Sequence, residues 1–271
     1  MSQRSTGERL DETKRRFARG ITLIKRLTQA TLETFGLRLV RIGTTSPNVA
    51  LAEDRRNWFF TAIKGLGFRP KHIIDVGAHK GSWTRTAFSF FPEAHYTLLE
   101  PQDHLKVHVQ DLLDRGCKIK WINAGAADKS GELPFTISYR DDSSSFAPTK
   151  INAGSPQVTV PVTTINEIVS TSNAPLPEMV KIDAEGFDIK VLAGASVLLG
   201  MTDIFLVEAA VWCPERENTV AEVVRWMDNA GYRLADVTDM NRSPKFGVLW
   251  LCELAFLRKA SPLWASVPFF E

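Results

Sequence analysis

Two carboxylates separated by a single residue stand in the stretch VKIDAEGFDIKVLAGA, residues 180–195. Asp183 ends an apolar segment, and Glu185 comes just before a helical pattern. A third acid, Glu208, ends the next apolar segment, 203–208. Because an unpaired buried charge is costly, these acids need a cationic or hydrogen-bonding partner. Carboxylates of this kind can take a proton from a hydroxyl group or hold a cationic ligand.

The first two acids also have a purely structural interpretation. Asp183 can pair with the side chain of Lys181 or Lys190. Glu185 can cap the following helix, because an acid in the first turn of a helix is stabilising. In the functional interpretation, Asp183 is the general base, Glu185 is an alternative base, and Glu208 helps to orient a polyhydroxylated substrate.

The metal-binding capacity of the sequence is limited. Three carboxylates suit a hard divalent cation, but no histidine stands at an obvious spacing from them, so we expect no metal ion. The three cysteines, Cys117, Cys213 and Cys252, are far apart and form no CxxC pair. Their spacing predicts neither a disulfide framework nor a zinc site, and it favours a reducing compartment.

A glycine-containing turn, DVGAHKG, follows the first predicted strand. Asp75 belongs to the end of that strand, and Gly77 and Gly81 have a GxxxG spacing with His79 between them. This spacing is not the GxGxxG of dinucleotide-binding proteins. The glycines permit a tight turn and a close approach of a ligand to the backbone at the start of a helix. His79 is a further alternative for the general base.

The second predicted strand ends in Glu100, within LLEPQ. An acid about 20 residues after a glycine turn is typical of a carboxylate that accepts hydrogen bonds from ribose hydroxyls. The alternative is a surface glutamate before a proline turn. Together with the turn, the spacing indicates a ligand that contains adenosine.

Apolar and helical patterns alternate along the chain, which favours an α/β fold with a parallel sheet covered by helices on both faces. The final two strands predict an antiparallel strand near the C-terminal edge. The predicted strands are 72–76, 95–100, 118–123, 179–183, 203–208, 232–237 and 248–257, with an inserted short pair at 133–138 and 157–162. The predicted helices are 82–91, 103–115, 163–170, 187–199 and 216–230.

Four motifs in this order, DVGAHKG, LLEPQ, INAGAAD and VKIDAEGFDIKVLAGA, resemble the FkbM-type methyltransferases. The resemblance covers about residues 72–210 and implies the class I Rossmann-like fold with S-adenosylmethionine as cofactor. It also implies O-methylation, commonly of sugar hydroxyls in glycolipids, polysaccharides or natural products. The family usually has Asn where this chain has His79, which leaves the contact made by that side chain open.

The expected positions in such a fold assign roles to the candidate residues. We expect Asp183 to face the sulfonium region of the cofactor and the incoming substrate. The other expected cofactor contacts are Asp75 and the loop Gly77, His79 and Gly81 at the methionine end, Glu100 at the ribose, and Asn123 and Ala124 at the adenine.

The N-terminal residues differ from the rest in charge. The chain of 271 residues has a net charge of +2, and residues 1–41 hold ten Lys or Arg and four Asp or Glu. We expect an amphipathic helical arm and linker over 1–54, followed by the methyltransferase domain over 55–271. The arm either packs on the domain or contacts an anionic membrane surface. No segment predicts a transmembrane helix or signal peptide, so we expect a cytoplasmic protein.

Alternative functions are a NAD(P)-dependent oxidoreductase and a non-catalytic adapter that binds an adenosine ligand. The glycine spacing argues against the first, and an intact cofactor site argues against the second. Enzymes that methylate the amino groups of bases carry Asp or Asn followed by Pro-Pro and an aromatic residue, whereas this chain has Asp183 followed by Ala-Glu-Gly. We therefore expect a hydroxylated small molecule or glycan as acceptor and no nucleic acid.

Overall fold

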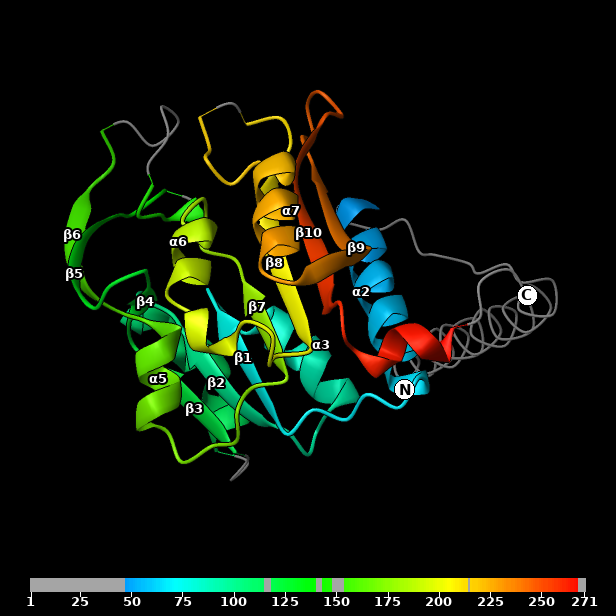
Figure 1. Ribbon diagram of the computed structural model, residues 1–271. Helices are drawn as coiled ribbons and strands as arrows, with labels where there is room; N and C mark the ends of the chain where they lie inside the picture. Colours follow the sequence, from blue (N-terminus) through cyan, green and yellow to red (C-terminus); the bar gives the residue numbers. More distant parts are fainter. Residues whose placement is uncertain (1–46, 115–117, 140–142, 148–153, 214, 268–271) are drawn as a thin grey trace, which may run out of the picture. The chain divides into compact units, whose positions relative to one another are not determined.

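The structure, a computed structural model, describes residues 47–114, 118–139, 143–147, 154–213 and 215–267 (Figure 1). The basic arm, residues 1–41, lies outside the described residues, as do its predicted helix and its membrane contact. Within the described part, no helix is long and apolar enough to cross a membrane.

A seven-stranded sheet with the strand order β3-β2-β1-β7-β8-β10-β9 forms the centre of the domain. Neighbouring strands are parallel except where β10 pairs antiparallel with β8 and with β9. The predicted parallel sheet with an antiparallel strand near its C-terminal edge is therefore confirmed. The strands are β1 (His72–Val76), β2 (His95–Leu99), β3 (Ile119–Ile122), β7 (Met179–Ile182), β8 (Ile204–Ala210), β9 (Tyr232–Arg242) and β10 (Leu249–Arg258).

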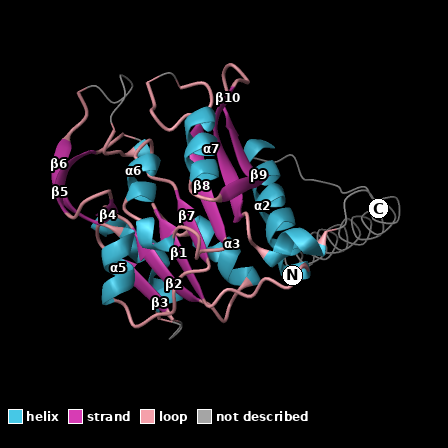
Figure 2. Ribbon diagram, viewed as in Figure 1, coloured by secondary structure: helices cyan, strands magenta, loops and turns pink. Residues whose placement is uncertain are grey.

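Helices cover both faces of this sheet (Figure 2). Because successive side chains of a strand point to opposite faces, Ile73 and Ile74 of β1 belong to two different apolar clusters. One cluster includes side chains of α2 (Pro47–Gly65), α3 (Ser82–Phe90) and α4 (Gln110–Leu113). The other includes side chains of α5 (Ile165–Thr171), α6 (Asp188–Ala193) and α7 (Val220–Asn229).

A second sheet with the order β4-β6-β5 stands beside the first. Its strands are β4 (Gly125–Ala126), β5 (Gly131–Thr136) and β6 (Gln157–Thr163), and the antiparallel pairing of β5 with β6 confirms the predicted inserted pair. The expected threonine cap of α5 is also confirmed, because the Thr164 side chain accepts a hydrogen bond of 3.0 Å from the backbone N–H of Glu167.

Several elements differ from the prediction. The sequence patterns did not indicate α2, and this helix crosses the expected boundary between residues 54 and 55, so part of the predicted linker is helical. The predicted helix 103–115 is a 3₁₀ helix, η1 (Asp103–Val109), followed by α4. The predicted helix 187–199 divides into α6 and η4 (Ser196–Leu198) around Gly194, where a Cβ would lie 2.0 Å from the carbonyl oxygen of Ala127. A further 3₁₀ helix, η5, spans Pro262–Ser266.

Candidate active site

The carboxyl ends of β1, β2, β7 and β8 open into a cavity of about 860 Å³. A parallel sheet places the ends of its strands at one edge, which is where ligands bind in open α/β folds. Six of the predicted site residues line the cavity: Gly77, His79, Glu100, Asp183, Glu185 and Glu208. The other four, Asp75, Gly81, Asn123 and Ala124, are not among the residues that line it.

The turn after β1 packs directly against the end of β7. Gly77 has a φ of 71°, and a Cβ at this position would lie 1.9 Å from the carbonyl oxygen of Asp183, so only glycine fits. Gly81 also has a positive φ, of 76°, but a Cβ there would meet Val109 at 2.5 Å. Gly81 therefore allows α3 to start close to its neighbour, and its contact with the cofactor stays a prediction.

His79 adopts the left-handed backbone conformation, with a φ of 48°. His and Asn are among the few side-chain types that tolerate this region. This tolerance explains why His can stand where the similar family usually has Asn. The N–H of His79 donates a hydrogen bond of 2.9 Å to Oε2 of Glu100, so the turn and the end of β2 are joined through the backbone of this residue.

Glu100 is buried, with 4% of its surface exposed, and its carboxylate holds two loops together. Besides His79, the backbone N–H and the side chain of Gln102 donate to Oε1, at 3.0 and 3.3 Å. Burial raises the pKa of Glu100 above its ordinary value, although these backbone hydrogen bonds oppose the rise. The carboxylate is thus fixed in the cavity wall before any ligand binds, and its contact with ribose stays a prediction.

The predicted adenine contacts are not placed on the cavity. Nδ2 of Asn123 donates to the carbonyl oxygens of Glu100 and Pro101, both at 3.1 Å, so this side chain secures the turn after β2. Ala124 is buried. The cavity is instead lined by the next two residues, Gly125 and Ala126, together with Phe135 and Phe146. The adenine contacts of Asn123 and Ala124 stay a prediction.

Lys181 connects the turn after β1 to the acid at the end of β7. Its Nζ lies 3.2 Å from Oδ1 of Asp75 and 3.3 Å from Oδ2 of Asp183, and it donates to the carbonyl oxygen of Gly77 at 2.9 Å. Asp75 is fully buried and also accepts a hydrogen bond of 2.5 Å from Thr84. The Asp75 carboxylate is thus engaged by Lys181 and Thr84, and its contact with the cofactor stays a prediction.

The ion pair between Asp183 and Lys181 is the structural alternative that the sequence offered for Asp183. Lys190 is not the partner, because its Nζ lies 4.5 Å from the ring centroid of Phe187. The Asp183 side chain keeps 39% of its surface exposed and still lines the cavity. It is therefore both an ion-pair partner and a group that a ligand can reach.

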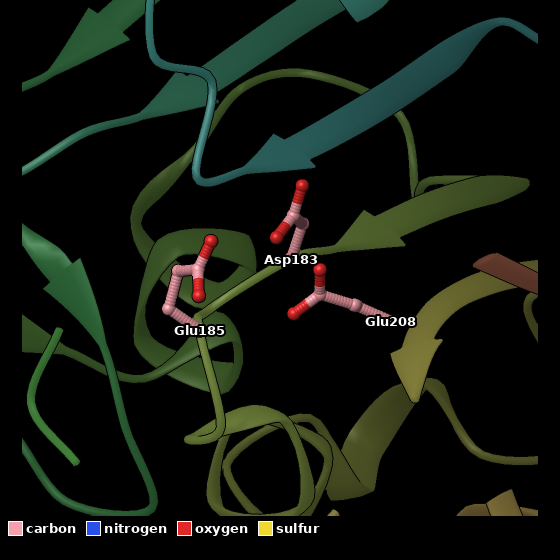
Figure 3. Close-up of side chains that lie close together, drawn as sticks. All are labelled: Asp183, Glu185 and Glu208. Atoms are coloured by element: carbon pink, nitrogen blue, oxygen red, sulfur yellow. The ribbon is translucent and has the colours of Figure 1, made fainter. Parts of the chain in front are cut away.

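Asp183, Glu185 and Glu208 converge on one space, as Figure 3 shows. One carboxylate oxygen from each lies within 4.8 Å of the others. Glu185 pairs with Nη2 of Arg216 at 2.8 Å, an arginine that the sequence patterns did not indicate. Oε2 of Glu208 is buried and has no hydrogen-bond partner among the described residues.

The ionisation of this cluster follows from burial and mutual repulsion. Burial and the charge of Asp183 raise the pKa of Glu185 to about 8, although Arg216 opposes the rise. Burial and the neighbouring acids raise the pKa of Glu208 well above its ordinary value. A cationic ligand would favour the ionised forms. The same three side chains could supply oxygen ligands to a divalent cation, although Lys181 and Arg216 already occupy oxygens of two of them.

The turn after β7 is held by Asp188 and not by Glu185. Oδ1 of Asp188 accepts from the backbone N–H of Ala184 at 2.9 Å, and Oδ2 accepts from Gly186 at 3.1 Å and from Asn218 at 2.7 Å. The structural alternative, in which Glu185 caps the following helix, is therefore not what the structure shows, because Glu185 pairs with Arg216. An acid at the first position of a helix is the sequence signal that could have identified Asp188.

The far wall of the cavity comes from elements outside the predicted site. Arg56 of α2 pairs with Asp239 of β9 at 3.2 Å and with Glu253 of β10 at 3.5 Å, and all three line the cavity. Oε1 of Glu253 also accepts from Thr238 at 2.6 Å. These residues carry no local motif, because the chain brings them together only through sheet formation.

This sheet order and a ligand site at its carboxyl edge define a Rossmann-like α/β enzyme. Within that class, the family model "Methyltransferase FkbM domain" matches residues 75–234, more than half of the chain. The protein therefore belongs to the FkbM methyltransferase family. It is a methyltransferase with the class I fold that uses S-adenosylmethionine, and the oxidoreductase and adapter alternatives are set aside. No functionally curated protein is similar enough in sequence to count as a match.

Several solved methyltransferase structures are similar to the chain. Precorrin-6y C5,15-methyltransferase from Geobacter metallireducens is 12% identical with a TM-score of 0.41, over 73% of this chain and 86% of that one. Magnesium protoporphyrin IX methyltransferase from Synechocystis, with bound S-adenosylmethionine, is 11% identical with a TM-score of 0.46, over 80% and 86%. The 1,6-didemethyltoxoflavin-N1-methyltransferase from Burkholderia thailandensis is 15% identical with a TM-score of 0.42, over 76% of this chain and 78% of that one. Identities and TM-scores this low carry no conclusion about substrate, and the assignment rests on the family match.

Proposed function

We propose that this protein transfers a methyl group from S-adenosylmethionine to a hydroxyl oxygen of a sugar. The observation that carries the proposal is the buried, unpartnered carboxylate oxygen of Glu208 in the cavity, beside Asp183 and Glu185. A hydroxyl group is a weak nucleophile and loses its proton during transfer, so a carboxylate within hydrogen-bond reach would assist the reaction.

The partners of the three acids favour Glu208 as the proton acceptor. Sequence position had favoured Asp183, but the ammonium group of Lys181 lies 3.3 Å from its Oδ2. Glu185 is similarly engaged by Arg216 at 2.8 Å. In each pair the cation holds a carboxylate oxygen, which leaves that oxygen less available to a substrate hydroxyl than Oε2 of Glu208. Asp183 and Glu185 would then orient the acceptor and favour binding of the cationic end of the cofactor.

The volume and the lining residues of the cavity support its assignment as the cofactor site. Its volume of about 860 Å³ lies within the range of small-molecule sites. The turn around Gly77 and His79 would hold the methionine end, Glu100 would bind the ribose, and Ala126 with Phe146 would face the adenine. When bound, S-adenosylmethionine supplies the methyl group as an electrophile. The protein positions the acceptor oxygen, which can account for up to about 7–11 kcal/mol of a reaction barrier.

The test is methyl transfer to an extract of the source organism in which the gene has been deleted. Purified protein and S-adenosylmethionine with a deuterated methyl group are added, and the products are analysed by mass spectrometry. We expect the label on a sugar as an ether, which survives mild alkaline treatment that hydrolyses methyl esters. Label found only on esters, amines or proteins would contradict the proposal.

Two variants connect this reaction to the acid cluster. Glu208→Gln keeps the shape of the side chain and removes the proton acceptor, so turnover should fall by about 10²-fold or more while cofactor affinity changes little. The matched control is Glu217→Gln, an exposed acid in the segment that follows β8, which should behave as wild type. A full rate in single-turnover measurements of Glu208→Gln would rule out this base.

A further inference from the structure

The rim of the cavity carries two tryptophans from neighbouring segments of the chain. Trp212 follows the end of β8, and Trp250 lies in β10. The backbone N–H groups of Val211 and Trp212 donate to the carbonyl oxygen of Trp250, at 2.8 and 3.2 Å, so the two segments are fixed to one another. Both tryptophans line the same cavity as Glu208.

Trp212 exposes 66% of its surface although it stands in a cavity wall. It stands four positions after Glu208 along the chain, so the Cα atoms of the two residues are at most about 14 Å apart. A molecule that contacts Trp212 can therefore reach the acid cluster with another part of itself. A flat, partly apolar ring that remains available to a ligand is a common feature of small-molecule sites.

The charges of the wall restrict the kind of ligand. Among the residues that the structure describes, seven acids line the cavity, namely Glu100, Asp183, Glu185, Glu208, Glu215, Asp239 and Glu253. Three basic side chains, Arg56, Lys181 and Arg216, line it as well, and each is paired with at least one of these acids. Even if two of these acids were neutral, the described lining residues would carry no excess of positive charge. Phosphate and sulfate groups would be repelled from such a wall.

We propose that Trp212, together with Trp250, forms the acceptor subsite of this methyltransferase and that the subsite stacks an uncharged sugar ring. The inference rests on the proposed function and narrows it. A pyranose ring has an apolar C–H face, which packs on an aromatic ring, and a rim of hydroxyl groups, which suits the polar residues around it. Sugars that carry a phosphate or a nucleoside diphosphate are excluded as the group bound at this position.

Saturation-transfer NMR tests the subsite without turnover. The probes are the methyl glycosides of glucose, mannose, rhamnose and fucose, each at millimolar concentration, with S-adenosylhomocysteine present. We expect transfer to the ring C–H protons of at least one neutral glycoside and none to glucose 1-phosphate. Absence of transfer to every neutral glycoside, or stronger transfer to glucose 1-phosphate, would overturn the proposal.

The variants are Trp212→Ala, Trp212→Phe and, as the matched control, Trp58→Ala. Trp58 is as exposed as Trp212, at 67%, but it belongs to α2 and is not among the residues that line the cavity. We expect Trp212→Ala to lose roughly tenfold in sugar affinity, Trp212→Phe to retain most of it, and Trp58→Ala to be unchanged. Equal affinity in Trp212→Ala and wild type would refute the subsite.

The two proposals fail in different ways. If sugars bind through Trp212 but the label in the extract is found elsewhere, the proposed reaction fails and the subsite stands. If the label is found on a sugar while Trp212→Ala binds and reacts as wild type, the reaction stands and the subsite fails.

Discussion

Replacing Lys181 by methionine tests how the site is held together. Lys181→Met keeps a long unbranched side chain and removes the ammonium group that lies between Asp75 and Asp183. Asp75 is fully buried and would be left with the hydroxyl of Thr84 as its hydrogen-bond partner. Removing one partner of a buried ion pair costs about 3–5 kcal/mol. We therefore expect the free energy of unfolding to fall by that amount and the melting temperature to fall by roughly 6–20 °C.

The pH dependence of this loss has a definite sign. Burial lowers the pKa of Lys181, but Asp183 and Asp75 outweigh burial and raise it above its ordinary value. A raised lysine pKa stabilises the folded state at every pH below the unfolded value, about 10.4, and the effect disappears only above it. The deficit of the variant is thus constant between neutral pH and about pH 10.

Urea denaturation followed by circular dichroism at pH 5, 7 and 9 measures the loss of unfolding free energy and its dependence on pH. The matched control is Lys190→Met, because Lys190 is exposed and contacts only the ring face of Phe187 among the interactions described for its ammonium group. A contact of this kind is worth about 0.5–1 kcal/mol. Calorimetry with S-adenosylhomocysteine should also show weaker binding to Lys181→Met, because the turn at Gly77 loses its hydrogen bond. If Lys181→Met were as stable as Lys190→Met at pH 7, the reasoning about the buried network would be refuted.

Three further predictions address the cofactor site and its charges. Glu100→Ala should weaken the binding of S-adenosylhomocysteine about tenfold or more, and unchanged affinity in calorimetry would remove the ribose assignment. Because the folded-state pKa of Glu185 is raised from 4.5 to about 8, its contribution to stability should be present below pH 4.5 and be lost as the pH rises through about 8. Thermal unfolding of the cofactor-free protein at several pH values checks this loss of stability. A melting temperature that rises between pH 4.5 and about 8 would contradict the prediction. Gly77→Ala should abolish cofactor binding, because its Cβ would lie 1.9 Å from the carbonyl oxygen of Asp183. The matched control is Gly200→Ala, because Gly200 has a similar φ of 78° and open space around the added Cβ. This variant should lose only about 1–2 kcal/mol of folding free energy and should bind the cofactor normally.

The sequence by itself determined the strands of the main sheet and the edge at which the candidate site lies. Short apolar segments alternating with helical patterns predicted all seven strands of the main sheet, because the side-chain period is a local property. The turn after β1 was recognisable from Gly77 and Gly81, and the acids Glu100, Asp183 and Glu208 from their place at the ends of strands. Lys181 and Asp183, two residues apart in one extended segment, were also recognisable as possible partners, because such residues share a face.

Only the tertiary structure decided how the acids are partnered. Asp75 meets Lys181 because β1 and β7 pair with these two residues in register, and a shift by one residue would turn Lys181 to the other face. Arg216 reaches Glu185 from a segment 31 residues further along, and Arg56 reaches Glu253 across 197 residues. No local pattern encodes such contacts, since they depend on how the strands align and how the helices pack on them. The residues that could be chemically active were therefore visible in the sequence, whereas the choice of Glu208 as the proposed proton acceptor depends on the packing that engages Asp183 and Glu185 with cations.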